Sequence, residues 1–379
     1  MSRRKPRVAI VSDPLVQRGG AERVVADGLA RAFPDAPIFA LLYSSKTGPA
    51  SIAERVQESW LGRLPGAASR HRLFLPLFPG AAESFDLSEY DIIVSSHHTF
   101  AKGVLRGAEQ LHVCYCHTPM RALWERSHAE LASIPAVGRP IAGAMFEYLR
   151  ARDYAAAARV DSFVANSATT RRRIRAHYGR DSDVVYPPID TDAFSPAPGP
   201  QGDYYLAASR LVPYKRIDIA IEATARMGKK LVVVGAGPLA PMVRGHEHVE
   251  YYGHVSDERL VELMRGARAL IFPPLEDFGM TPLEMMACGR PVIGFGEGGA
   301  AETIVDGVTG ITVAEQTGEA FAAGIARFES MTFDTFGLRR HALRFSRDKF
   351  VSTMSDLVLG QWASRTSQVG RYALNERTA

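Results

Sequence analysis

Two glutamates, Glu276 and Glu284, stand with seven residues between them in "LEDFGMTPLEMMACGRP" (275–291). The segment predicts a loop that turns into a helix, and two explanations compete. With Thr281 as N-cap and Pro282 at the first helical position, Glu284 would close a capping box and have a purely structural role. Alternatively, the helix starts directly after the apolar run "ALIFPP", so its free N–H groups bind an anion. The carboxylates then accept hydrogen bonds from hydroxyl groups on either side of that anion.

The second explanation describes a diphosphate between two sugars, and such a ligand requires cations from another loop. "SRLVPYKR" (209–216) supplies them after a further apolar run. Arg210 and Lys215 would form a clamp for the diphosphate. A lone pair of this kind is more often surface charge, and only its place after a strand favours the clamp.

Apolar runs that end in polar residues recur along the chain and must position these groups. In the first half they are "RVAIVSD" (7–13), "YDIIVSSH" (90–97), "LHVCYCH" (111–117) and "DSFVANS" (161–167). In the second half they are "DYYLAASRL" (203–211), "KKLVVVGAGP" (229–238), "VEYYGHV" (249–255), "ARALIFPP" (267–274) and "RPVIGFG" (290–296). Such runs are typical of parallel strands buried on both faces.

Helices are expected between these strands. Residues 216–228 have helical spacing, with Ile217, Ile221 and Ala225 on the buried face. "SDERLVELMRGA" (256–267) predicts a helix capped by Ser256 or Asp257. Its expected buried residues are Leu260, Leu263 and Met264.

A proline-rich stretch, "YPPIDTDAFSPAPGPQGD" (186–203), divides the two halves. It predicts an N-terminal acceptor-side domain (1–187), a linker (188–203), a C-terminal donor-binding domain (204–344), and a C-terminal helix with a fraying polar tail (345–379). The fold class is α/β, with two Rossmann-like, doubly wound parallel-sheet domains. Ligands are expected at the carboxyl ends of the strands, in a crevice between the domains.

Composition narrows the class of protein. The 379 residues are 46% hydrophobic and 23% charged, with a net charge of +4, which is too small to indicate a nucleic-acid partner. Cys114, Cys116 and Cys288 match no disulfide scaffold or zinc site and predict small buried side chains in a reducing compartment. The first apolar run is broken by Asp13 and Pro14, unlike a signal peptide. No stretch approaches the about 20 apolar residues of a membrane span.

These motifs resemble the nucleotide-sugar glycosyltransferases of the GT-B fold, specifically the large retaining family (family 4) with an E-x7-E motif. The matching stretches are Glu276 to Glu284, Arg210 with Lys215, "VVVGAGP" (232–238), "GGAER" (19–23) and "YCHTPMRALWE" (115–125). They occur in family order over nearly the whole chain. A finer resemblance is to bacterial GDP-mannose-dependent mannosyltransferases of O-antigen and exopolysaccharide assembly, from which Met280 departs by replacing an aliphatic residue.

The resemblance implies transfer of a hexose with retention of configuration, by ionisation of the sugar–phosphate bond. Charge then grows on the leaving diphosphate, and preorganised donors stabilise it without a metal or other cofactor. The implied catalytic residues are His117, Glu276, Arg210 and Lys215, with His117 contacting the donor sugar near the reacting carbon. The implied donor-binding residues are Gly19, Gly20, Gly235, Val255, Phe278, Gly279, Met280, Thr281 and Glu284.

Several alternatives remain open. Asp190-Thr191-Asp192 spells the D-x-D of manganese-dependent sugar transferases, but it lies in the linker, which argues against a metal site. His97 and His98 also end a strand and could line the acceptor side. The donor could be a UDP-sugar instead of GDP-mannose. Less favoured classes are a nucleotide-sugar 2-epimerase and a non-catalytic nucleotide-sugar binder.

Two segments without acidic residues bear on the acceptor. Residues 60–81 mix three arginines with Trp60 and several apolar side chains, and residues 168–180 carry five arginines. Either they are ordinary solvated helices, or they face an anionic membrane surface. On the second view the acceptor is linked to polyprenyl diphosphate, and the protein is cytoplasmic and peripheral on the inner face of the membrane.

Overall fold

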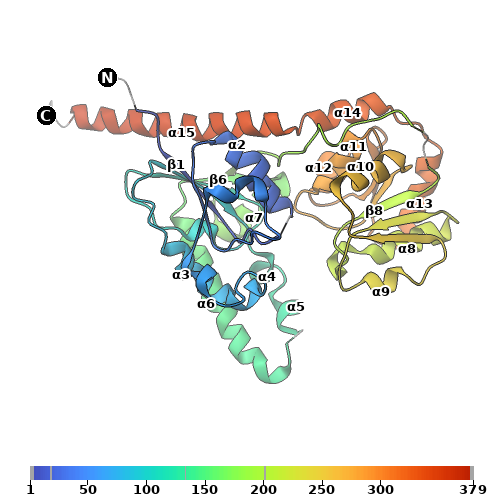
Figure 1. Ribbon diagram of the computed structural model, residues 1–379, viewed down its shortest axis with the longest axis horizontal. Helices are drawn as coiled ribbons and strands as arrows, with labels where there is room; N and C mark the ends of the chain where they lie inside the picture. Colours follow the sequence, from blue (N-terminus) through green and yellow to red (C-terminus); the bar gives the residue numbers. More distant parts are fainter. Residues whose placement is uncertain (1–3, 18, 133, 200–201, 376–379) are drawn as a thin grey trace. The chain divides into compact units, whose positions relative to one another are not determined.

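The computed structural model describes residues 4–17, 19–132, 134–199 and 202–375 (Figure 1). It divides into two compact units. Unit 1 comprises Met1–Pro188 and Phe350–Ala379, and unit 2 comprises Ile189–Lys349. The linker prediction covers residues 200 and 201, and the fraying prediction covers 376–379; these six residues lie outside the described part of the chain.

The sheet of unit 1 has seven parallel strands in the order β3-β2-β1-β4-β5-β6-β7. The strands are β1 (Val8–Ser12), β2 (Ile38–Ala40), β3 (Val56–Glu58), β4 (Ile92–His97), β5 (Leu111–Cys116), β6 (Ser162–Ala165) and β7 (Ser182–Val184). The four apolar runs predicted here as strands are confirmed. Strand order reverses direction between β1 and β4, which creates a topological switch point.

Helices cover both faces of this sheet. They are α1 (Gly20–Arg23), α2 (Ala30–Ala32), α3 (Phe78–Glu83), α4 (Arg121–Trp124), α5 (Ser127–Ala132), α6 (Arg139–Ala158), α7 (Ala168–Tyr178) and α15 (Arg347–Asn375). A π-helical turn (Val24–Leu29) and 3₁₀ turns (Ala50–Arg55, Trp60–Arg63, His71–Leu77, Ala101–Gly103, Ala136–Gly138) complete the unit.

The last helix, α15, closes the core of unit 1. Its Phe350, Met354 and Val358 join the buried cluster formed by the strands, and Figure 1 shows α15 in red beside α2. A Cβ at Gly28 would lie 2.5 Å from the Phe350 ring, so this glycine permits the close approach. The tail expected to fray after residue 364 is helical as far as Asn375, which corrects that prediction.

The sheet of unit 2 has six parallel strands in the order β10-β9-β8-β11-β12-β13. They are β8 (Tyr205–Ala208), β9 (Leu231–Val234), β10 (Val249–Gly253), β11 (Leu270–Phe272), β12 (Val292–Phe295) and β13 (Gly310–Val313). The helices are α8 (Ile217–Arg226), α9 (Ala240–Val243), α10 (Asp257–Gly266), α11 (Met280–Ala287), α12 (Ala300–Thr303), α13 (Gly318–Glu329) and α14 (Thr335–Leu343), with a 3₁₀ turn at Pro213–Lys215. The α/β prediction with two parallel sheets is confirmed, and here the switch point lies between β8 and β11.

Two local helix predictions hold with small corrections. The Ser256 side chain caps α10 by accepting from the backbone N–H of Arg259. Val261 is buried there, and Leu260 is only half-buried. On α8, Ala225 is exposed, and Thr224 takes the buried position. The Thr224 hydroxyl donates to the carbonyl of Ala220, which satisfies it inside the core.

Cys114, Cys116 and Cys288 are buried and form no disulfide, as expected. Burial raises the pKa of Cys114 and of Cys288 to about 12, so both thiols are protonated and unreactive at neutral pH. Over the described residues, every helix falls short of the length or apolar character that crossing a bilayer requires.

Candidate functional site

Two of the predicted ligand-binding residues meet at the switch point of unit 2. Lys215 lies in the loop after β8, and Glu276 lies in the loop after β11, the strand adjacent to β8. The Lys215 ammonium donates to the Glu276 carboxylate in an ion pair. Their side chains are only 15% and 20% exposed, so the pair is partly shielded but open to solvent. The carboxyl ends of strands at such a switch point are the usual ligand site of this sheet type.

The backbone around Lys215 is held in an uncommon conformation. Arg216 has a φ of 51°, and among the described residues it is the one non-glycine with a positive φ. Side chains rarely adopt this left-handed region, and its cost of about 1 kcal/mol or more has to be offset by the surroundings. The Arg216 guanidinium donates to the Gln316 side chain, whose amide donates to the carbonyl of Pro273 in the β11 loop. The two loops of the switch point are thus tied together.

A glycine after β9 supports the loop that carries Arg210. Gly235 has a φ of 128°, and a Cβ there would lie 1.8 Å from the carbonyl oxygen of Ser209. Any larger residue would displace that loop. The Arg210 side chain is exposed and donates to the Tyr214 hydroxyl at 2.5 Å. Val255, the other residue expected near the base, is half-buried just before α10.

The start of α11 decides between the two explanations of Glu284. The N-cap is Gly279, with a φ of 86°, and no side chain caps the helix. The helix therefore begins at Met280, two residues earlier than a Thr281 cap would allow. Glu284 is its fifth residue, beyond the third position that a capping box requires. The capping-box explanation is wrong, because the left-handed glycine starts the helix first.

The side chains of this segment differ in accessibility. Glu284 and Phe278 are buried, each 3% exposed, whereas Met280 and Thr281 are half-buried. A carboxylate is thus buried one helical turn behind N–H groups that no side chain caps. This placement suits a carboxylate that accepts a specific hydrogen bond, because isolated buried charge is costly.

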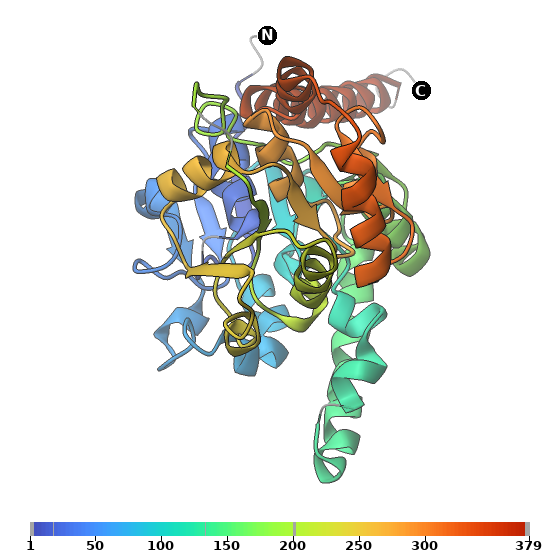
Figure 2. The same cartoon turned by 90° about the vertical axis from the view of Figure 1, so that its right-hand side faces the viewer.

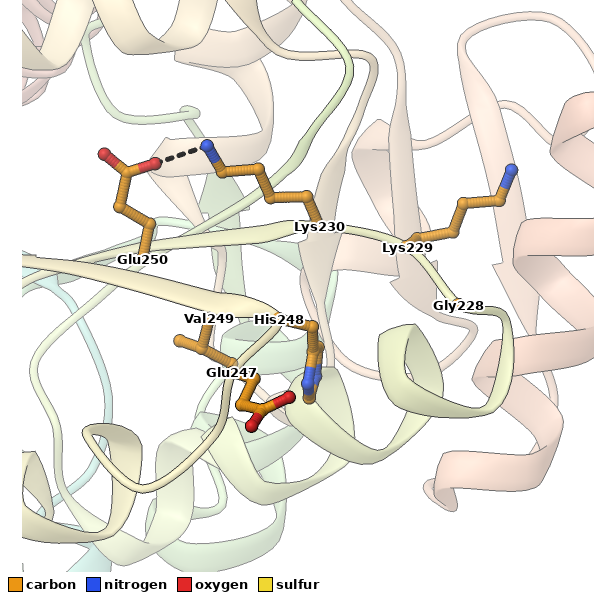
Figure 3. Close-up of a pocket in the computed structure, with 7 residues that line it drawn as sticks. All are labelled: Gly228, Lys229, Lys230, Glu247, His248, Val249 and Glu250. Atoms are coloured by element: carbon orange, nitrogen blue, oxygen red, sulfur yellow. Dashed lines mark ion pairs between the residues drawn. The ribbon is translucent and has the colours of Figure 1, made fainter.

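Two hollows on the described surface of unit 2 lie at the opposite edge of its sheet. One, of about 520 Å³, is lined by residues 228–230 and 247–250, which precede β9 and β10 (Figure 3). Figure 3 shows Lys230 paired with Glu250 there, both on the surface. The other, of about 550 Å³, includes Arg268 and Arg290. Strand ends at this amino edge do not carry the predicted site residues, so these hollows are separate from the switch point.

The switch point of unit 1 is organised by Asp13, directly after β1. Its carboxylate accepts from four consecutive backbone N–H groups, His98 to Ala101, at 2.6–2.9 Å, and from the Thr99 hydroxyl. Although burial raises the pKa of Asp13, the neighbouring His98 and His97 and these N–H groups hold it well below its ordinary value. Asp13 therefore stays charged and fixes the loop after β4. In the sequence it appears only as the polar residue that ends an apolar run.

His117 directly follows β5, beside this loop. It is 8% exposed, and its Nε2 lies 2.8 Å from the Ser96 hydroxyl. Burial lowers the pKa of His117 to about 3, so the ring is neutral at pH 7. Its ring packs edge-on against His98, with centroids 6.1 Å apart. A neutral imidazole of this kind can donate or accept one hydrogen bond to a ligand.

The two other strand-end histidines differ. The His98 side chain is 34% exposed, with Nδ1 3.3 Å from the Asp13 carboxylate, so it can reach a ligand. His97 is fully buried and lies 3.3 Å from the Lys102 ammonium. Lys102 is itself fully buried and forms an ion pair with Asp153 of α6. His97 thus belongs to the interior of unit 1, which excludes it from the acceptor side.

The glycine loop after β1 starts a helix, as its sequence predicts. Gly19 is the N-cap of α1, and Gly20 is its first residue. A Cβ at Gly19 would lie 2.5 Å from the Glu22 carboxylate, which is buried. Only glycine therefore lets the chain pass over this carboxylate without moving it.

The D-x-D sequence has a structural role. Asp190 forms an ion pair with Arg347 at the start of α15, and it accepts from the backbone N–H groups of Asp192 and Ala193. These contacts close a turn at the edge of unit 2. Over the described residues, no group of three or more His, Cys, Asp or Glu side chains is placed to hold a metal ion.

Comparisons with known proteins agree with this architecture. A model described as "Glycosyltransferase Family 4" matches residues 18–193, and one described as "Glycosyl transferases group 1" matches residues 189–344. The chain is 32% identical over 236 residues to a D-inositol 3-phosphate glycosyltransferase of Geodermatophilus obscurus, covering 52% of each chain. It is 31% identical over 304 residues to the protein of that name from Acidothermus cellulolyticus, covering 69% of this chain and 65% of the relative. The chain thus spans about half to two thirds of the length of these relatives.

Solved structures show the same fold at low identity. The Anabaena protein HepE in complex with UDP has a TM-score of 0.68 at 18% identity, covering 93% of this chain and 100% of that one. The lipopolysaccharide outer core galactosyltransferase WaaB has a TM-score of 0.65 at 17% identity, covering 94% and 99%. These names do not extend to GDP-mannose or O-antigen assembly, so the finer resemblance stays a prediction. The chain thus has the two-domain GT-B fold, and each of its halves matches a family model of glycosyltransferases.

Proposed function

We propose that the protein is a retaining glycosyltransferase that moves a hexose from a nucleotide sugar to a hydroxyl group of an acceptor. The observation that carries this proposal is the Lys215–Glu276 pair at the switch point of unit 2, beside the uncapped start of α11. At the carboxyl ends of β8 and β11, this arrangement provides a cation for a diphosphate and a carboxylate for sugar hydroxyl groups. The start of α11 provides helix N–H groups that no side chain caps.

In the proposed mechanism, the chemical step breaks the bond between the sugar and the diphosphate. Negative charge grows on the leaving diphosphate, and Arg210, Lys215 and the amides of Gly279 to Thr281 stabilise it. Glu276 and Glu284 accept hydrogen bonds from hydroxyl groups of the sugar and the ribose. The acceptor oxygen bonds to the same face of the reacting carbon and gives its proton to the leaving diphosphate, so the sugar retains its configuration.

For unit 1 we propose, on the family resemblance, that the Gly20 amide and His117 also bind the donor. The neutral His117 ring contacts the donor sugar near the reacting carbon, since its low pKa makes it a hydrogen-bonding group and not a cation at pH 7. Because all these stabilising groups are amides and side chains, the proposal requires no metal ion.

For the donor we propose GDP-mannose, on the resemblance of residues 276–304 and 116–121 to mannosyltransferases. A UDP-hexose is the second candidate. It is favoured by the fold likeness to HepE, which was solved in complex with UDP-glucose with a TM-score of 0.67 at 18% identity. The base is expected to contact the chain near Gly235 and Val255.

Calorimetry with GDP-mannose, UDP-glucose and UDP-N-acetylglucosamine in EDTA tests the donor. We expect one donor to bind and Glu284→Ala to weaken it by tenfold or more, about 1.4 kcal/mol, because a buried hydrogen-bond acceptor is lost. Glu250→Ala, at the other edge of the same sheet, is the matched control and should bind normally. If no nucleotide sugar binds, or if Glu284→Ala lowers only the melting temperature, the donor site is misassigned.

For the acceptor we propose a polyprenyl-diphosphate-linked or other saccharide at an anionic membrane surface. The segment 60–81 supports this, since Trp60, Leu73 and Leu77 are exposed among the exposed arginines 63, 70 and 72. The segment 168–180 offers fewer arginines to a membrane than its composition indicates. Arg173 pairs with Glu125, and Arg180 donates to three backbone carbonyls.

Liposome sedimentation checks the membrane proposal. Each basic residue near an anionic surface contributes about 1 kcal/mol, so binding should rise with the fraction of anionic lipid and fall with added salt. Replacing the three arginines of 60–81 together by glutamine should remove this preference. Equal sedimentation with neutral and anionic liposomes would exclude it.

A further inference from the structure

The solvent-exposed face of α6 carries a stripe of uncharged, mostly apolar side chains. The helix packs its inner face, including Leu149 and Asp153, into unit 1, and the charged Arg150 and Arg152 are half-buried beside it. Ten positions of α6 are exposed, and six of them form one uncharged stripe: Ile141, Ala144, Tyr148, Ala151, Ala155 and Ala158. Ile141 is 75% exposed and Tyr148 is 48% exposed. An uncharged stripe along the exposed side of a helix, with large apolar residues in it, is typical of a face that packs against a partner.

The spacing of these six residues indicates what covers them. They alternate at three and four residues, which is the seam of a helix that packs along another helix. The 20 residues of α6 span about 30 Å, enough for the whole seam to be used. Figures 1 and 2 both show the hairpin of α5 and α6 extending beyond the body of unit 1, so its seam lies on a projecting element.

We propose that α6 pairs in antiparallel orientation with α6 of a second copy of this chain, about a twofold axis between residues 149 and 150. Side-chain size selects this arrangement. Ile141 then faces Ala158 of the other copy, Tyr148 faces Ala151, and Ala144 faces Ala155. Each large side chain meets a small one, so the helices approach evenly. A parallel pair would instead place Tyr148 on Tyr148 and alanine on alanine.

Charge selects the same register. At the margins of the seam, Glu147 faces Tyr154 of the other copy, whose hydroxyl can donate to it, and Met145 packs on Arg152. Sliding the pair by seven residues in one direction places Glu147 against Glu147. Sliding it in the other direction places Arg152 against Arg152. Opposed like charges are destabilising, so both shifted pairings are disfavoured. Arg152 is already ion-paired with Glu83 of its own copy, which leaves little of it for a parallel Glu147–Arg152 contact.

A lipid surface fits this face less well. Four of the six residues are alanine, which buries little apolar area, whereas interfacial helices depend on large apolar side chains flanked by lysine and arginine. A second copy supplies both halves of the seam by symmetry, and twofold homodimers are the commonest closed assembly.

The molar mass of the full chain, measured by light scattering after size-exclusion chromatography, tests the pairing. We expect twice the 41.4 kDa mass of one chain for the wild type and 41.4 kDa for Ala151→Glu, because the new carboxylate lies at the centre of the seam. Ala363→Glu, at an exposed position of α15, should keep the doubled mass. Since both alanines are exposed, circular dichroism should show the same fold for all three proteins. A single-chain mass for the wild type at about 100 μM, far above the Kd of a specific dimer, would overturn the proposal.

Cysteine cross-linking tests the register and orientation. Ala144→Cys mixed with Ala155→Cys should form a disulfide dimer under mild oxidation, since the two positions face each other within the about 7 Å that a disulfide spans. Either variant alone should not, because its own cysteines lie far apart along the seam. The three native cysteines are buried, so the wild-type protein, treated in the same way, should not cross-link. A doubled mass that persists in Ala151→Glu, or cross-linking by either variant alone, would exclude this pairing.

Discussion

A Lys215→Met variant is expected to lose about 10²–10³-fold in kcat for hexose transfer, the usual cost of removing one donor aimed at transition-state charge. Methionine keeps the apolar stem of lysine and removes only the ammonium group. The loss should appear in kcat more than in KM, because the charge on the leaving diphosphate develops as the bond breaks. Release of nucleoside diphosphate, followed at saturating donor, measures it.

The same unit offers a matched control for this variant. Lys230 also forms an ion pair with a glutamate, Glu250, but at the other edge of the sheet, where the side chains are 52% and 42% exposed. Lys230→Met should change kcat little, since an exposed pair contributes about 0–1 kcal/mol to stability and nothing to the site. Equal losses in both variants, or none in Lys215→Met, would contradict the assigned role. The melting temperature of each variant separates a folding defect from a catalytic one.

The strands show how far local pattern predicts this fold. Each of the nine apolar runs predicted as strands contains one. The strands β3 and β7 were not predicted, because polar residues interrupt them and they form no apolar run. Strand β2 was not predicted although it begins an apolar run at 38–43, since a short apolar run alone does not distinguish a strand from a buried helix. Pairing with a neighbour in the sheet, and not local sequence, makes them strands. Strand β13 was missed because two glycines and polar residues surround its short apolar run.

The positions of site residues that directly follow a strand could be predicted from the sequence. Lys215 and Glu276 follow strands that neighbour each other at the switch point, so their meeting follows from topology. The start of α11 was not predictable from the Thr-Pro sequence, because the left-handed Gly279 initiates the helix. The contacts of Asp13 join residues about 85 positions apart, and no local pattern indicates such a partner.

The two switch points use ionic groups for different purposes. In unit 1, Asp13 is 1% exposed and the hydrogen bonds that it accepts from residues 98–101 lie within the protein, so it fixes the shape of the loop after β4. In unit 2, the Lys215–Glu276 pair is partly exposed, and an ammonium with three donors can hold a carboxylate and a phosphate together. Both groups lie at the switch point of their sheet. Their exposure distinguishes them: the buried Asp13 supports the loop, and the partly exposed Lys215–Glu276 pair is available to a ligand.

The largest expected effect on stability is that of Lys102→Met, which should destabilise unit 1 by about 3–5 kcal/mol. The reason is that Asp153, 0% exposed, would keep a buried charge without its cation. Urea unfolding followed by tryptophan fluorescence reports on this unit alone, because all three tryptophans, at positions 60, 124 and 362, belong to it.

A second substitution distinguishes lost pairing from lost packing. The Asp153 carboxylate also accepts from the Trp124 indole and from the Tyr178 hydroxyl, each at 2.8 Å. In Lys102→Met/Asp153→Asn the charge is gone, but an amide oxygen still accepts these two bonds. The double variant should therefore recover much of the lost stability, since removing both charges is far less costly than removing one. A double variant as unstable as the sum of its two single variants would show that Lys102 acts by packing, and that the buried pair contributes no coupling of its own.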